Sequence, residues 1–342
     1  MSDISVIGLD IAKNVFHLVG CDANGKQIKR KELKRQQVLK FFSQYPPCCV
    51  AMEACATSHY WGREIEKLGH QVKAIPPQHV KPYLHGSKND FNDAAAIAEA
   101  ATRPRIRPVP IKTEDQQVLQ AVHRARELAV AERTALSNQI RGILAEFGIV
   151  FPKSLVRLRK HMAELTAPDS IELRPSLKQL MDKLYRRFKQ CDEHVSDLDK
   201  DILQHVERQP ECELLRTIPG IGPITASAIY ASAGDASEFK RGRDFAASIG
   251  LVPKQHSSGG KEVLLGITKR GNSRLRYLLV HGARSLIRHA DKKNDALSRW
   301  AVRLHQTRGY NRAAVALANK LARIACAVLH SGECFTPNYH SA

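Results

Sequence analysis

Two short apolar runs near the start of this chain each end in a carboxylate. Asp10 follows the run at residues 6–9, and Glu53 follows the run at residues 49–52. Asp90 and Asp93 are three residues apart, where a helix is expected to begin. Clustered carboxylates repel one another and raise each other's pKa, and a hard divalent cation such as Mg²⁺ relieves that cost. The pattern therefore predicts an α/β fold in which four acids bind Mg²⁺.

The charge balance indicates a polyanionic partner. The 342 residues include 53 Lys and Arg against 34 Asp and Glu, a formal net charge of +19. Residues 267–323 alone hold 14 Lys and Arg but two acids, Asp291 and Asp295. Such a local basic surface favours nucleic acid over a membrane. Charge by itself is also compatible with a ribosome-associated or simply a basic soluble protein.

The apolar segments and cysteines point to a reducing, cytoplasmic location. No stretch is expected to reach the roughly 18 apolar residues of a membrane span. The first residues, MSDIS, lack a basic segment followed by an apolar one, so no secretion signal is expected. The eight cysteines have no zinc-ligand spacing. We therefore expect no membrane partner.

The first part of the chain predicts an α/β domain over residues 1–110. Strands are expected at 4–9, 15–21, 27–33, 48–52 and 71–75, with helices at 38–45 and 58–68. Asn24-Gly25 favours a tight hairpin between the second and third strands. Three antiparallel strands followed by alternating helices and strands is the order of an RNase H-like domain.

The middle of the chain, residues 111–210, predicts a long helical arm. One helix is expected from Thr113 to Phe147, and a second begins at Pro175. The apolar positions of the second repeat at alternating spacings of three and four, as in a coiled coil. The spacing leaves open whether the arm is an intramolecular hairpin or a dimerisation arm.

The last part, residues 211–342, predicts a mostly helical domain. Residues 218–223 resemble the turn of a helix-hairpin-helix element, in which Gly220 and Gly222 would let the backbone approach a phosphate. Residues 255–261 are expected to form a polar, flexible loop, and basic amphipathic helices follow from Tyr277 to Leu329.

Taken together, these motifs resemble a known family, the four-acid (DEDD) insertion-sequence transposases that act as bridge-RNA-guided serine recombinases. The N-terminal motifs are GLDIAK at 8–13, MEAC at 52–55 and KNDFNDA at 88–94. The C-terminal ones are TIPGIG at 217–222, GLVP at 250–253, SSGG at 257–260 and TKRGNSRLR at 268–276. Their order and spacing cover nearly the whole chain.

The resemblance implies a mechanism. Asp10, Glu53, Asp90 and Asp93 would bind Mg²⁺ in an RNase H-like domain of the RuvC type, and a serine of the C-terminal domain would attack DNA to form a 5′-phosphoserine link. The matching serine is Ser258, with Ser257 as its rival.

The same resemblance implies the partners. A structured non-coding bridge RNA would select donor and target DNA, and homodimers would assemble into a tetramer on nucleic acid. The location would be the cytoplasm of a bacterium, in association with the nucleoid. The expected nucleic-acid contacts come from the helix-hairpin-helix glycines and from the basic motif after the serine: Gly220, Gly222, Lys269, Arg270, Asn272, Arg274 and Arg276.

Two other functions remain open at this point. A metal-dependent junction nuclease or a conventional transposase would use the same acids without a covalent intermediate, and would need no serine in a C-terminal loop. A non-catalytic nucleic-acid-binding protein would need neither the serine nor the four acids.

Overall fold

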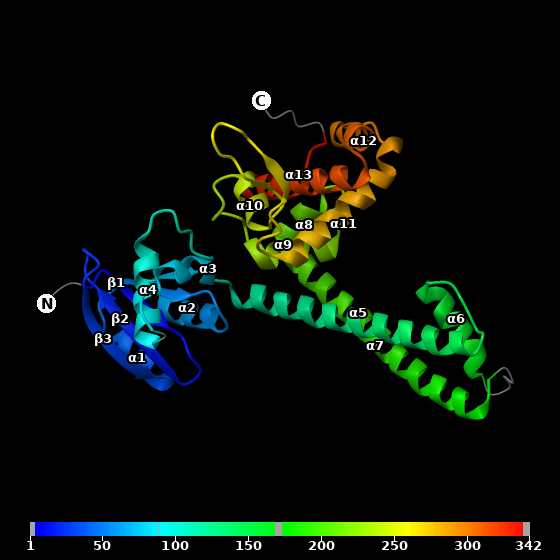
Figure 1. Cartoon of the computed structure of the whole chain (residues 1–342), viewed down its shortest axis with the longest axis horizontal. Helices are drawn as coiled ribbons and strands as arrows, with labels where there is room; N and C mark the ends of the chain where they lie inside the picture. The colour runs from blue at the N-terminus through cyan, green and yellow to red at the C-terminus, as the bar shows by residue number, and fades with distance from the viewer. Residues whose placement is uncertain (1–3, 88, 168–172, 338–342) are drawn as a thin grey trace. The chain divides into compact units, whose positions relative to one another are not determined.

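A computed structural model describes residues 4–87, 89–167 and 173–337. Lys88, the first residue of the third acidic motif, lies outside the described residues. The chain divides into two compact units, Met1–Glu114 and Asp115–Ala342 (Figure 1). The first is a mixed α/β unit and the second is mostly helical. The division into three domains at residues 110 and 210 stays a prediction.

The first unit is built on a five-stranded sheet of order β3-β2-β1-β4-β5. The three N-terminal strands are antiparallel, and β4 and β5 run parallel to β1. The strands are β1 (Val6–Asp10), β2 (Val15–Cys21), β3 (Gln27–Lys34), β4 (Cys49–Glu53) and β5 (Gln71–Ile75). The helical segments are η1 (Arg35–Gln37), α1 (Val38–Ser43), α2 (Ser58–Glu66), α3 (Pro77–Val80), η2 (Lys81–Tyr83) and α4 (Asp90–Thr102).

Helices cover both faces of this sheet, because each strand alternates its side chains between them. Ile7 and Leu9 are fully buried in the core that also contains Phe42 of α1 and Ile65 of α2. The opposite face packs against the alanine-rich α4. Gly8 permits this close approach, since a Cβ there would lie 2.0 Å from the carbonyl oxygen of Ala94. The α4 face is therefore the face toward which Asp10 projects.

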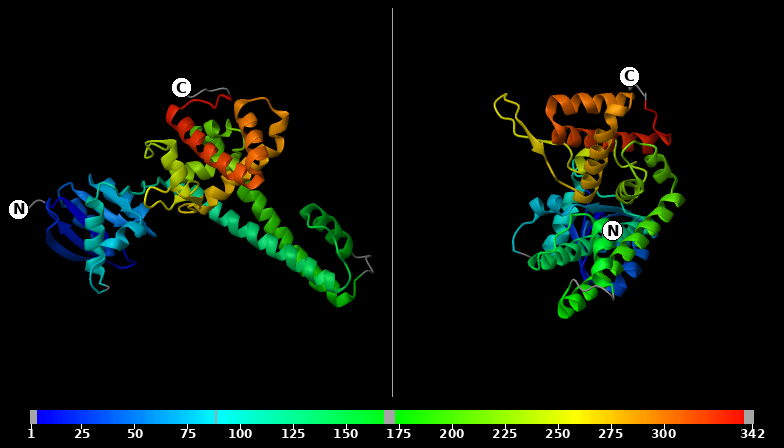
Figure 2. Two further views of the ribbon diagram at one scale, coloured as in Figure 1. Left: turned by 45° about the horizontal axis from the view of Figure 1, so that its top comes forward. Right: turned by 90° about the vertical axis from the view of Figure 1, so that its right-hand side faces the viewer.

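The second unit begins with a helical hairpin. Helices α5 (Glu114–Glu146) and α7 (Pro175–Arg208) run side by side in every view, with α6 (Leu155–Thr166) near their turn (Figures 1 and 2). Arg126 pairs with Asp199, and Arg133 Nη1 lies 2.8 Å from Asp192 Oδ1. Val195 and Leu198 of α7 pack with Ala129 of α5, so the apolar seam of α7 is covered within the same chain, which is the intramolecular alternative. Dimerisation through the arm stays a prediction.

The remaining helices form one large core around α13 (Tyr310–Ser331). They are α8 (Pro210–Arg216), α9 (Pro223–Ala233), α10 (Gly242–Ser248), α11 (Ser273–His289), η3 (Ala290–Lys292) and α12 (Ala296–Arg308). The strands β6 (Pro253–Gln255) and β7 (Leu264–Ile267) form a separate, mostly exposed ribbon.

Helix α13 corrects one expectation about apolar stretches. Within the part of the chain that the structure describes, α13 is the one helix that is long enough and apolar enough to cross a membrane. This test uses length and composition alone. Leu317 and Leu321 on this helix are fully buried against α10, α11 and α12. Its apolar character is that of a central core helix.

Candidate active site and nucleic-acid surface

Asp10 and Glu53 occupy corresponding positions on neighbouring strands. Leu9 of β1 pairs with Met52 of β4 in the parallel ladder, so the next residue on each strand is an acid. Leu9 and Met52 both point into the core beneath α1 and α2. Because side chains alternate along a strand, Asp10 and Glu53 both project toward α4.

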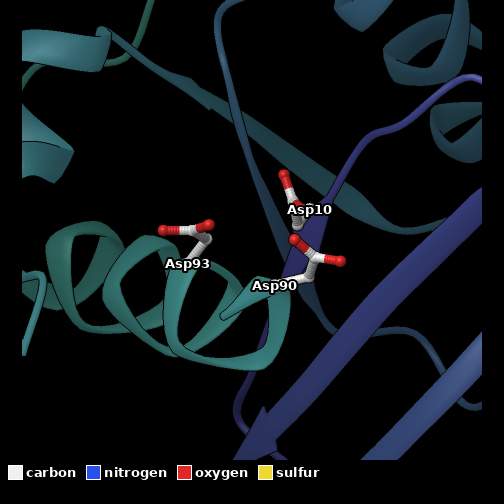
Figure 3. A group of neighbouring side chains, drawn as sticks. All are labelled: Asp10, Asp90 and Asp93. Carbon is white, nitrogen blue, oxygen red and sulfur yellow. The ribbon is translucent and has the colours of Figure 1, made fainter. Parts of the chain in front are cut away.

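Helix α4 brings two more acids to the same place. Asn89 caps its N-terminus by accepting a hydrogen bond from the Phe91 amide at 2.9 Å, and Asp90 and Asp93 lie in the first turn. Residues three apart share one face of a helix. A ligand oxygen from each of Asp10, Asp90 and Asp93 lies within 4.8 Å of the others (Figure 3). Glu53 is not part of this group of three.

The electrostatics tie the fourth acid to the others. Burial and the carboxylates of Asp93 and Asp90 raise the pKa of Asp10 to about 6. Burial and the charge of Asp93 also raise the pKa of Glu53. The four carboxyl groups therefore influence one another electrostatically, and repulsion between them disfavours their ionised forms.

His17 also belongs to this site, and sequence reasoning missed it. It pairs with Asp10 in the β1–β2 ladder, so it points to the same face. Its Nδ1 lies 3.5 Å from Asp90 Oδ2, and its Nε2 lies 3.8 Å from Glu32 Oε2. The signal in the sequence was a lone polar residue within the apolar strand from Val15 to Cys21.

The donor set fits a divalent cation. Carboxylate oxygens are the ligands that Mg²⁺ prefers, and a cation offsets the repulsion that raises the pKa of Asp10. The three clustered oxygens are close enough to reach one ion, and Glu53 would need a longer reach or a bridging water.

Ser258 lies in the other unit, at the tip of the β6–β7 ribbon, drawn in yellow in Figure 2. The segment expected to be a flexible loop is a hairpin: the Lys261 amide donates to the Ser258 carbonyl at 3.1 Å. Between them, Gly259 and Gly260 have φ of 57° and 78°, as a two-residue turn with positive φ at both positions requires. The turn leaves Ser258 exposed.

Comparison with known proteins identifies the family. A model described as "Transposase IS116/IS110/IS902 family" matches residues 212–299, and a DEDD model of the IS110 type, described as "Transposase", matches residues 7–149. A Pseudomonas aeruginosa protein named "Probable family 20 transposase" is 47% identical over 98% of this chain and 99% of its own length. The Coxiella burnetii "Transposase for insertion sequence element IS1111A" is 44% identical over 98% of this chain and 92% of its own. The chain belongs to the IS110/IS116 family of transposases.

A Yersinia enterocolitica "Transposase for insertion sequence element IS1328" is also similar, at 42% identity over 98% of this chain and 100% of its own. This transposase is therefore an insertion-sequence enzyme that cuts and joins DNA. The DEDD domain, matched over residues 7–149, is RNase H-like and of a type that works with a divalent metal.

Several of the residues expected to contact nucleic acid instead bind other residues of the same chain. Arg276 Nη1 donates to the carbonyls of Ile249 at 2.8 Å and Arg270 at 2.9 Å. Arg274 Nε lies 2.6 Å from Glu127 Oε1 on α5. Their role in nucleic-acid binding stays a prediction, but both guanidinium groups have partners inside the protein.

Residues of the segment before α11 also make hydrogen bonds within the protein. Asn272 caps α11 by accepting a hydrogen bond from the Leu275 amide at 3.0 Å. The Lys269 amide donates to the carbonyl of Gly250 at 3.2 Å, in a backbone conformation with φ of 56°. The side chains of Lys269 and Arg270 remain exposed, so they are the better placed of this group to meet a phosphate.

The two glycines of the helix-hairpin-helix element differ. Gly220 has φ of 87°, and a Cβ on it would lie 2.9 Å from the carbonyl oxygen of Gly282 on α11. Gly222 caps the N-terminus of α9, and nothing lies within 4 Å of the position of its missing Cβ. Gly220 thus has a packing role, whereas the surroundings of Gly222 leave room for a ligand.

Proposed function

We propose that this transposase recombines DNA through a covalent 5′-phosphoserine intermediate, with Ser258 as the nucleophile and Mg²⁺ held by Asp10, Glu53, Asp90 and Asp93. The observation that carries the proposal is the convergence of three carboxylates within 4.8 Å, with Glu53 on the neighbouring strand. A cation bound there supplies positive charge that stabilises an in-line displacement at phosphorus.

The proposed step exchanges one phosphate ester for another. The Ser258 Oγ bonds to phosphorus while the bond from phosphorus to the 3′-oxygen breaks. The serine proton passes to solvent, and the leaving 3′-oxygen takes a proton to become a 3′-hydroxyl. The phosphate stays on the serine as a 5′-phosphoester, so the number of ester bonds is conserved. Rejoining by attack of another 3′-hydroxyl then requires no ATP.

The geometry of the ribbon favours Ser258 over Ser257 as the nucleophile. Ser257 Oγ accepts a hydrogen bond from Gln255 Nε2 at 3.0 Å, which engages it inside the hairpin. Within the part of the chain that the structure describes, the Ser258 hydroxyl has no such partner. A hydroxyl at the tip of an exposed two-residue turn can enter a site on another surface. The serine and the acids belong to different units, so a composite site from two protomers is compatible with the fold.

Site selection by a structured guide RNA, and assembly of homodimers into a tetramer, complete the proposal. Both come from the resemblance of the motifs to bridge-RNA-guided recombinases. The 14 Lys and Arg of residues 267–323 supply a surface that can bind phosphates of RNA as well as DNA. A requirement for RNA is tested by recombination assays with and without RNA transcribed from the element's non-coding end.

A covalent-trapping assay tests the chemistry. The protein, its RNA, a cognate DNA junction labelled on either side of the cut, and Mg²⁺ are incubated and then separated under denaturing conditions. A protein band that carries the label from the 5′-phosphate side is expected. The alternative function, a junction nuclease or conventional transposase, predicts cut DNA without that band. Cleavage without an adduct, under conditions that trap a known serine recombinase, would refute the serine mechanism.

A further inference from the structure

The edge strand β3 carries a second concentration of positive charge, far in sequence from residues 267–323. Six exposed or half-buried basic residues lie on β3, in the turn after it and in the β1–β2 loop: Lys13, Lys29, Arg30, Lys31, Lys34 and Arg35. We name this set the basic edge. From Lys29 to Arg35 the chain has one acid, Glu32, whose carboxylate is 3.8 Å from His17. The basic edge is therefore strongly positive.

The β-sheet register places this charge beside the acidic site. β2 separates β3 from β1, and strands are about 4.8 Å apart, so β3 lies roughly 10 Å from β1. His17 pairs with Asp10 on one side and with Glu32 on the other. Lys34 lies two residues beyond Glu32, at the end of the sheet where the acids are. Any DNA strand at the acids comes within reach of this edge.

Aromatic rings hold two of the lysines in place. Lys29 Nζ lies 4.8 Å from the ring centre of Tyr45, and Lys31 Nζ lies 5.0 Å from that of Phe41. The two rings are stacked, with centres 5.3 Å apart. A cation held over an aromatic ring loses less side-chain freedom when it binds a phosphate than a free surface lysine does. These two ammonium groups are thus partly fixed at the edge, on the α1 face of the sheet.

The side chains of β3 alternate between the two faces of the sheet. Arg30 and Lys34 share the face of Glu32, which pairs with His17 and therefore lies on the side of the acids. Lys29 and Lys31 point to the opposite face, over the two stacked rings. In the described part of the chain β3 has no strand partner on its outer side, so a phosphate backbone that follows this edge can meet cations from both faces.

We propose that the basic edge binds the phosphate backbone of the DNA strand that leads into the four-acid site. The proposal rests on that site being where DNA is cut, and it adds a contact that positions the strand. DNA is favoured over RNA because the edge adjoins the acids at which DNA would react. Edge lysines also prevent strands of different molecules from pairing, a role that requires no nucleic acid. The experiment must separate these roles.

The test is the salt dependence of DNA binding by the full-length protein, in EDTA so that no cleavage occurs. The test variant is Arg30→Gln/Lys31→Gln/Lys34→Gln, which changes three exposed residues. The matched control is Lys67→Gln/Lys81→Gln/Arg105→Gln, which removes the same charge from exposed positions outside β3. Each contact to duplex DNA contributes about 0.9 to the slope of log Kd against log salt concentration. The test variant should lose roughly 2.7 units of slope if all three residues contact phosphates.

The control variant should keep most of the salt-dependence slope. Because both variants lose the same net charge, a smaller slope in the test variant alone would show that the basic edge contacts phosphates directly. Thermal unfolding and sedimentation of both variants check folding and self-association. An unchanged slope together with new self-association of the test variant would show that the basic edge only protects the sheet. A slope change with a structured RNA but not with duplex DNA would assign the surface to RNA and overturn the proposal. Because cleavage is absent, failure of the serine mechanism would leave this result unaffected.

Discussion

His17 Nδ1 lies 3.5 Å from Asp90 Oδ2, and in the strand ladder His17 pairs with Asp10. One imidazole thus links an acid on β1 with an acid on α4, and these elements are separated by some eighty residues of sequence. The Phe91 ring packs on the same imidazole in a T-shaped arrangement, with ring centres 4.8 Å apart. The imidazole is thus packed by Phe91, and its Nδ1, which makes no hydrogen bond within the described residues, faces the Asp90 carboxylate and can orient it.

Replacing His17 should therefore weaken metal binding without removing a ligand. Loss of a group that orients a ligand typically costs about 10–100-fold in metal affinity. We expect His17→Ala to lose affinity for Mn²⁺ in this range, measured by calorimetry or electron paramagnetic resonance, and His17→Gln to recover part of it. His85→Ala, at an exposed position of the same unit, is the control. Equal affinity in His17→Ala and wild type would show that His17 does not orient the site.

The pKa of Asp10 sets a pH dependence for the metal-free protein. Folding raises this pKa from its ordinary value of 3.8 to about 6, through burial and the neighbouring carboxylates. The folded state therefore binds the Asp10 proton more tightly than the unfolded chain does. This contribution to the free energy of unfolding is fully present below pH 3.8 and is lost as the pH rises through 6. Urea unfolding in EDTA between pH 4 and 8 measures it.

Metal binding should have the opposite trend, since the cation competes with the proton. Affinity is expected to rise as the pH increases through 6, and Asp10→Asn should flatten both pH dependences. The same variant should abolish strand cleavage while keeping nucleic-acid binding, because the basic surfaces are unchanged. Asp201→Asn, at an exposed position on α7, is the control. A wild-type metal affinity that is constant from pH 5 to 8 would contradict the assignment of Asp10.

The acidic site shows what the sequence can and cannot predict. Strand ends and a helix start are local features, so Asp10, Glu53, Asp90 and Asp93 could be selected from apolar runs and a capping residue. The contact of His17 depends on strand register, which an apolar run does not reveal. Arg276 illustrates the same limit: its basic character predicts a phosphate contact, whereas its two hydrogen bonds to the carbonyls of Ile249 and Arg270 are tertiary.

Helices and strands could likewise be predicted only where their sequence has a clear local pattern. The long helices and the five strands have strong periodicity, and α7 begins at Pro175 as expected. The short helices α3 and α8 and the ribbon of β6 and β7 were not predicted, because each has too few residues to show a period. The ribbon is defined by the Gly259-Gly260 turn, which in the sequence is equally typical of an irregular loop.

The close contact between Gly220 and Gly282 gives a prediction about stability. A Cβ on Gly282 would lie 2.0 Å from the Gly220 carbonyl oxygen, so the turn before α9 would have to move away from α11. Overpacking of this kind costs about 1–3 kcal/mol. We expect Gly282→Ala, and Gly220→Ala with its strained φ of 87°, to lower the free energy of unfolding by this amount.

Gly142→Ala provides the matched comparison, since this position lies within α5 and nothing is within 4 Å of its missing Cβ. Alanine is favoured over glycine in a helix interior by about 1 kcal/mol, so this variant should be more stable than wild type. Denaturant titrations of the three variants and the wild type compare their free energies of unfolding. Similar stability of all three variants would show that the turn at Gly220 does not pack closely on α11.

The two serines of the ribbon give the most direct test of the chemistry. Ser258→Ala should remove both the covalent adduct and recombination, because it deletes the proposed attacking oxygen and leaves the hairpin turn of Gly259 and Gly260 intact. Ser257→Ala should reduce activity only modestly, since it removes one hydrogen bond with Gln255 at 3.0 Å. Such a bond contributes about 0.5–1.5 kcal/mol, or roughly a 2- to 12-fold change if all of it were lost from the transition state.

Denaturing electrophoresis for the adduct and a recombination assay distinguish the outcomes, with binding to DNA as the control for folding. If Ser257→Ala is the inactive variant, the nucleophile is the neighbouring residue and the role of the turn must be reassigned by one position. If both variants recombine DNA at the wild-type rate, no ribbon serine attacks phosphorus. The four acids would then act with water or a DNA 3′-hydroxyl, as in a conventional transposase.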